Sequence, residues 1–150
     1  MMLVTFVIIG AFSNGTDAMN VWGQQQDSLS ADRQRYIDEI LNSVKGREGM
    51  AADSVFKNLE TFTGTASVKV THFLGIMKYW ATSLGVSCNY CHNTSNWSSD
   101  EKRPKQIGRD MFAMRQTING QILKNIKDLQ SATPRVNCRT CHAGKIIPKE

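Results

Sequence analysis

Apolar residues recur every three or four positions along most of the chain, which is the spacing of one face of an α-helix. The first such stripe predicts a helix over about 31–45, after a polar segment at 19–30 that predicts a flexible leader. The next stripe predicts a short helix over about 53–64, with Asp53 or Ser54 as its N-terminal cap. The N-terminal third of the chain is therefore expected to be helical.

The same spacing continues through the rest of the chain. It predicts a third helix over about 67–84 that ends at Gly85, and a long fourth helix over about 104–129 with Pro104 in its first turn. No segment alternates apolar and polar residues with the period of two that a strand needs. The predicted fold class is all-α.

Each of these two later helices is followed by a Cys-x-x-Cys-His segment, so the chain contains a weak tandem repeat. The segments are Cys88–His92 and Cys138–His142, and they hold all four cysteines of the chain. This pentapeptide attaches haem c: two thiols form thioethers with the vinyl groups, and the adjacent imidazole coordinates the iron. The sequence therefore predicts two haem c groups, bound by Cys88, Cys91, Cys138 and Cys141, with His92 and His142 as iron ligands.

Other uses of paired cysteines fit the pattern less well. Zinc ribbons also use two Cys-x-x-Cys pairs, but about 15 to 20 residues usually separate them, whereas 46 residues lie between Cys91 and Cys138. Zinc would also leave both histidines without a role. Thioredoxin-like dithiols need a strand and helix setting that the pattern lacks, and disulfides need no histidine at a fixed offset.

Composition narrows the range of partners. A chain of 150 residues is the size of one domain, and 41% apolar with 8% aromatic residues is ordinary for a soluble protein. The formal net charge is +5, but the basic residues are scattered and form neither a run nor an aromatic-interleaved stripe. This excludes a nucleic-acid partner and favours acidic redox proteins as electron donor and acceptor.

The N-terminus predicts export. Residues 1–18 combine an apolar run with a small-residue end and are interpreted as a secretory signal peptide, which implies a periplasmic protein. The run is shorter than the roughly 20 apolar residues of a spanning helix, so no transmembrane span is predicted. Residues 19–50 are assigned to the leader and first helix, and 51–150 to a dihaem cytochrome c domain.

The second axial ligand decides what each haem does. An iron with both axial positions filled by protein ligands favours electron transfer. An iron with one axial position free can bind or activate small molecules. Besides the two motif histidines only His72 remains, so methionines on the apolar stripes are the candidates. Met77 has no close rival on its helix. Met111 and Met114 lie one turn apart on the fourth, periodicity does not choose between them, and either is equally suited to plain core packing.

At these positions the chain resembles the cytochrome c subunit of photosynthetic reaction centres and its shorter dihaem relatives in non-phototrophic bacteria. The resemblance covers roughly residues 51–145. The matching segments are Val55–Leu59, Met77–His92, Trp97–Lys102, Arg109–Asn119 and Val136–Gly144.

The resemblance implies a small helical multihaem cytochrome built from two tandem units, each a methionine helix followed by a haem motif. It implies Met77 and Met114 as distal ligands, the latter because Ile118 and Asn119 fix its position. Two motifs equal half of the four-haem subunit, so a respiratory or photosynthetic electron carrier is expected, with a membrane redox complex among its partners. The alternative is a dihaem peroxidase-like enzyme, which needs an exchangeable iron position and a distal acid–base group.

Overall fold

The computed structural model describes residues 16–148, without the side chains of residues 16–22 and 65. In that part of the chain it contains helices and loops but no sheet, which confirms the all-α prediction. The elements in chain order are α1 (Thr16–Ser43), α2 (Ala52–Val55), the 3₁₀ turns η1 (Gly64–Ala66) and η2 (Cys88–Tyr90), with α3 (Val70–Leu84) between them, then α4 (Arg103–Thr117), the π-helical η3 (Ile118–Ile122), the 3₁₀ turn η4 (Leu123–Asn125) and α5 (Cys138–His142).

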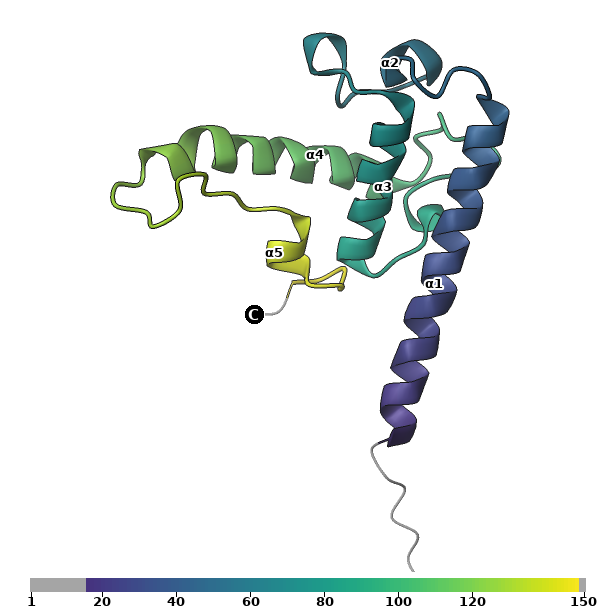
Figure 1. The fold of residues 1–150 in the computed structure, drawn as a ribbon, viewed down its shortest axis with the longest axis horizontal. Coiled ribbons are helices and arrows are strands. Elements are labelled where there is room, and N and C mark those ends of the chain that lie inside the picture. The colour runs from purple at the N-terminus through teal and green to yellow at the C-terminus, as the bar shows by residue number, and fades with distance from the viewer. Residues whose placement is uncertain (1–15, 149–150) are drawn as a thin grey trace, which may run out of the picture.

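Helix α1 begins at Thr16, far earlier than predicted, so the prediction of a flexible leader over 19–30 is wrong. The segment contains no proline, and its many glutamines are good helix formers. Ion pairs from Arg35 to Asp32 and Glu39, at 2.6 and 2.7 Å, add helical side-chain contacts further along. In Figure 1 the N-terminal part of α1 extends beyond the other helices. Residues 1–15, which hold most of the predicted signal peptide, lie outside the described residues.

The predicted helix over 53–64 is also wrong beyond its first turn. Helix α2 ends at Val55 because Phe56 is extended, with φ −97° and ψ 144°. Asp53 does not cap this helix. Its carboxylate instead accepts hydrogen bonds from Gly64 N, at 2.9 Å, and from Ser67 Oγ, at 2.5 Å, and so closes the loop that follows α2.

Helix α3 is the centre of the fold and confirms the third predicted helix, apart from a start at Val70. It ends where predicted, at Gly85, whose φ of 66° is in the left-handed region. Val70, Phe73 and Leu74 form the core with Val44 and Ala52. Each buried side chain of this size stabilises the fold by about 1.5–3 kcal/mol, so the packing of α1 and α2 on α3 sets the frame for everything else.

Helix α4 joins this frame through aromatic side chains. Phe112 lies 4.6 Å from the Phe62 ring and 5.4 Å from Trp80, measured between centroids. In Figure 1, α4 runs across α3 and away from α1. The predicted end at residue 129 is wrong, because the helix changes to π and 3₁₀ turns after Thr117 and Ile126 is extended. None of the described helices is long and apolar enough to cross a membrane.

Candidate functional site

The first Cys-x-x-Cys-His motif is a single helical turn directly after α3. The amides of Cys91 and His92 donate to the carbonyl of Cys88 at 3.3 and 3.1 Å. Residues three and four positions apart in such a turn lie on the same side. Both thiols and the imidazole are therefore carried by one side of the turn.

Side chains of helix α1 hold this turn in place. The sequence analysis missed this arrangement. Arg33 is only 2% exposed, and its Nε donates to the carbonyl of Val86 at 2.7 Å. Its Nη2 lies 3.5 Å from the carbonyl of Ala81. The Ser87 hydroxyl donates to Asp32, and this bond holds the pKa of the carboxylate below its usual value. A charged residue on a polar helix gives no sequence signal for such a contact.

His92 is half-buried beside the next loop. Burial, with the nearby cations Lys105 and Arg109, lowers its pKa to about 4, so the imidazole is neutral at neutral pH. Its Nδ1 is buried and has no hydrogen-bond partner among the described residues. The Trp97 ring lies 5.4 Å from the imidazole, centroid to centroid, and contacts Tyr36 of α1 at 5.7 Å. A neutral imidazole is the form that coordinates iron.

Ion pairs to α4 hold the loop that carries Trp97. Asp100 pairs with Lys105 at 3.0 Å and with Arg109 at 3.1 Å, and Asn58 donates to the same carboxylate at 2.8 Å. These hydrogen bonds and charges hold the pKa of Asp100 well below its usual value. Lys105 also donates to the carbonyl of Trp97, at 3.1 Å. The position of Trp97 against His92 is therefore tied to α4.

The second motif forms the short helix α5, which the sequence analysis did not predict. Asn137 and Thr140 make a capping box, with each side chain bonded to the other's backbone amide at 3.1 Å. Asn at the cap and a hydroxyl residue three positions later was the available signal. Asn119 of η3 makes two hydrogen bonds to the backbone of Val136, at 2.8 and 2.9 Å, and so fixes the start of the motif.

His142 differs from His92 because its Nδ1 has a hydrogen-bond partner. Its Nδ1 lies 3.1 Å from the carbonyl of Lys145. A proton on Nδ1 that donates to this carbonyl leaves Nε2 free to bind a metal, which is the usual arrangement of ligating histidines. Cys138 is half-buried and Cys141 is exposed, so the second motif lies nearer the surface than the first.

The thiols themselves have the chemistry of neutral cysteines. Burial raises the pKa of Cys88, Cys91 and Cys138 above its ordinary value. Reactive dithiols and metal thiolates depend on the opposite shift. No disulfide joins the four cysteines, and within residues 16–148 no three Cys, His, Asp or Glu side chains gather as metal ligands. The geometry therefore favours neither a disulfide nor a metal-thiolate site.

The two motifs meet at the end of α3. The amide of Gly144, just after α5, donates to the carbonyl of Ser83 at 2.8 Å. Gly85 faces the same segment so closely that a Cβ there would collide with the Gly144 carbonyl. Since the first motif starts three residues after Gly85, the fold brings together the two segments that the sequence separates by 46 residues.

The predicted distal ligands lie on α3 and α4. Met77 is half-buried and packs against the core. Met111 and Met114 are 37% and 47% exposed and share an open apolar face of α4 with Ile107. His72 is exposed on α3. No contact of these side chains with either motif decides the ligands, and their assignment remains a prediction.

Comparisons with known proteins agree with this picture. The photosynthetic reaction center cytochrome c subunit of Rubrivivax gelatinosus is 31% identical over 111 residues, which are 74% of this chain and 28% of the relative. The subunit of Thermochromatium tepidum is 26% identical over 135 residues, 90% of this chain and 31% of the relative. Cytochrome c-554 of Chloroflexus aurantiacus is 32% identical over 85 residues, 57% of this chain and 20% of the relative.

The chain thus spans less than a third of the length of each of these relatives. Residues 12–150 match the family described as photosynthetic reaction centre cytochrome C subunit, a longer match than the predicted resemblance over 51–145. The predicted resemblance is confirmed, and the chain belongs to the photosynthetic reaction centre cytochrome c subunit family.

Proposed function

We propose that this chain carries two covalently bound haems c and transfers single electrons between redox partners in the periplasm. The observation that supports this most strongly is the shape of the two motifs. Each is one helical turn that carries two thiols and an imidazole on one side, at Cys88–His92 and at Cys138–His142. This is the donor set that haem c requires.

The surroundings of the motifs also suit a porphyrin. The open face of α4, with Ile107, Met111 and Met114, is apolar over two turns and would be covered by a flat apolar ring. His142 is oriented by the Lys145 carbonyl, and His92 is held neutral by burial. The haems supply the redox chemistry, while the protein orients the imidazoles and excludes water from the first site.

A second axial ligand would make the sites electron-transfer centres. We propose Met77 and Met114 for this role, because each lies on the helix that precedes a motif. An iron closed by His and Met has no position for a substrate, and such ligation raises the potential. The chain then acts as a carrier and not as a peroxidase-like enzyme.

The partners are proposed from charge and from the relatives. A net charge of +5 suits acidic electron donors and acceptors. The relatives are named as reaction centre subunits, so a membrane redox complex is a reasonable partner, in a respiratory or photosynthetic chain. Binding to such a partner should weaken with ionic strength.

Haem attachment is the direct test of this proposal. We expect the native protein to keep its colour after acid–acetone extraction and to exceed the polypeptide mass by two haems. The reduced protein should not bind carbon monoxide, because both irons are closed. Release of the colour into the solvent would contradict covalent attachment, and rapid carbon monoxide binding would contradict the closed sites.

A further inference from the structure

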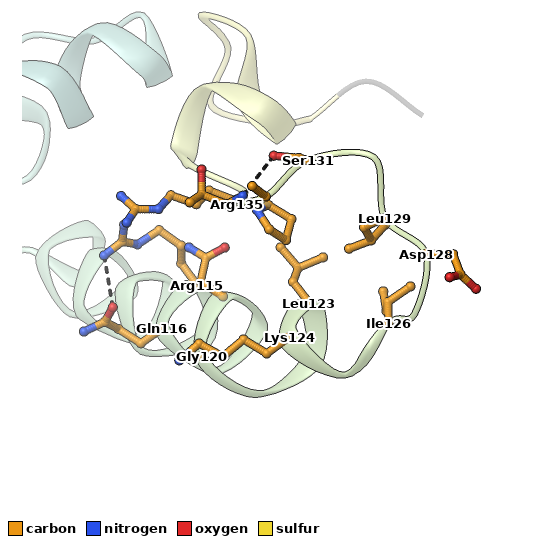
Figure 2. A pocket seen from close by; sticks show the side chains of 14 residues that line it. Arg115, Gln116, Gly120, Leu123, Lys124, Ile126, Asp128, Leu129, Ser131 and Arg135 are labelled. Carbon is orange, nitrogen blue, oxygen red and sulfur yellow. Dashed lines mark hydrogen bonds between the residues drawn. The ribbon is translucent and has the colours of Figure 1, made fainter.

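A basic pocket lies beside the second motif. It is open to solvent, has a volume of about 760 Å³ and is lined by the end of α4, by η3 and η4, and by the loop over 126–135 (Figure 2). Its charged lining residues are Arg115, Lys124, Asp128 and Arg135. Three cations against one carboxylate make this an anion-binding environment.

Arg115 has an unused hydrogen-bond donor in this region. Its Nε is buried and has no partner among the described residues. Its Nη2 donates to the Gln116 side chain at 3.2 Å, and its Cζ lies 4.7 Å from the Phe112 ring centroid. The side chain is thus held in place while one buried donor remains unpaired. A buried unpaired donor destabilises a protein unless a ligand completes it.

Arg135 provides a second guanidinium at the same end of the pocket. In Figure 2 the side chains of Arg115 and Arg135 extend in the same direction, whereas Asp128 lies at the opposite end. Within residues 16–148, neither arginine forms an ion pair. Two guanidinium groups that extend to the same side without an acidic partner suit the binding of a carboxylate or phosphate.

We propose that Arg115 and Arg135 bind a carboxylate at this site, namely a propionate of the haem attached at the second motif. This inference rests on the proposed function, since the haem supplies the carboxylate. The pocket adjoins the motif, because Asn119, which lines the pocket, is bonded to Val136, two residues before Cys138.

Arg115 also lies within electrostatic range of the second motif. Arg115 acts on the Cys138 thiol, where its charge opposes the increase in pKa that burial causes. A haem bonded to Cys138 would carry two propionates, and these are its acidic groups. Lys124 and Asp128 also line the pocket, and their opposite charges partly cancel.

Such a pair would set the potential of the second haem. Positive charge near a haem favours the ferrous form, which carries one charge less, and so raises its potential. The same charge keeps the propionate ionised at neutral pH. Removal of one arginine should lower the potential. It should also raise the propionate pKa, so that the potential falls as pH rises through the neutral range.

The test compares Arg115→Gln, Arg135→Gln and the double variant with Lys127→Gln, in the holoprotein. Lys127 is exposed in the same loop and does not line the pocket, so its variant removes one charge without touching the pair. We expect one of the two haem potentials to fall and become pH-dependent in the arginine variants only. In the same variants, the resonance Raman bending modes of the haem propionates should also shift. Arg115→Lys, which retains charge but not Nε, should show a smaller shift and serves if a Gln variant does not fold.

The outcomes separate this inference from the proposed function. A double variant that holds two haems by mass but keeps the wild-type potentials and Raman modes overturns the arginine pair alone. An equal shift in Lys127→Gln overturns it too, because the effect would then be general electrostatics. Acetate that stabilises the wild type but not the double variant, with potentials unchanged, would show that the pair takes a carboxylate from solution and not a propionate. A wild type without covalent haem would overturn the proposed function itself.

Discussion

The two haem motifs have the same chemistry, but the protein holds them differently. Cys88–His92 is fixed from α1 by the buried Arg33, and its half-buried imidazole packs against Trp97. Cys138–His142 is held by its own capping box and by two hydrogen bonds from Asn119, and Cys141 is exposed. The first motif is half-buried and tied to α1, whereas the second is held by bonds near its own start and has an exposed cysteine.

This difference should separate the two potentials. A hydrogen bond from Nδ1 to the Lys145 carbonyl makes His142 a stronger donor to iron, which favours the ferric state. Nδ1 of His92 is buried without a partner, and burial further disfavours the more highly charged ferric haem. The first haem is therefore expected to have the higher potential. The two pentapeptides share both cysteines and the histidine, so we expect any difference between the two potentials to come mainly from groups elsewhere in the chain.

Removal of each haem in turn should have the largest effect. We expect Cys88→Ala/Cys91→Ala to lower the thermal midpoint by about 10 °C more than Cys138→Ala/Cys141→Ala, which is about 3 kcal/mol for a domain of this size. The reason is that Cys88, Cys91 and His92 are all partly buried, whereas Cys141 of the second motif is exposed, so the first haem would cover more apolar surface. Circular dichroism melts, with haem content checked by mass, measure this. Equal losses would contradict this contrast between the two motifs.

The contacts that hold the motifs should have a smaller effect. Arg33→Met leaves the carbonyl of Val86 without its donor, whereas the carbonyl of Ala81 keeps the amide of Val86 at 3.0 Å, and a buried unpaired acceptor costs about 1–3 kcal/mol. We expect a loss of about 2 kcal/mol in the free energy of unfolding, measured by urea denaturation. Asn119→Ala removes two bonds at a less buried place and should cost about 1 kcal/mol. The reverse order would mean that the second motif is the more tightly held one.

The contrast also shows which features a sequence can reveal. The motifs, the all-α class and the end of α3 at Gly85 were predictable, because each depends on residues close together in the chain. The role of Arg33 was not, since its partners are 48 and 53 residues away. The long α1 was missed because its polar N-terminal part has no apolar stripe. Helix α5 was missed because it is a single turn whose signal is only a capping box.

The distal ligands should give the smallest effect on stability and the sharpest spectroscopic one. Met114 lies outside the hydrophobic core and a histidine in its place could still ligate the haem, so Met114→His should change the free energy of unfolding by no more than about 0.5 kcal/mol. Met77 packs against the core, and Met77→His should cost about 1 kcal/mol. Both variants should keep two haems and lower one potential, because a second His replaces Met.

Met111 is the matched control, since it lies one turn from Met114 on the same open face. Met111→Leu conserves volume and removes only the thioether, so it should leave both potentials nearly unchanged if Met111 is an apolar filler. The near-infrared charge-transfer band of ferric haem with Met ligation should lose half of its intensity in Met114→His and persist in Met111→Leu. Loss of the band in Met111→Leu would move the ligand by one helical turn. The helix would then present Met111, the less exposed of the two, to the iron.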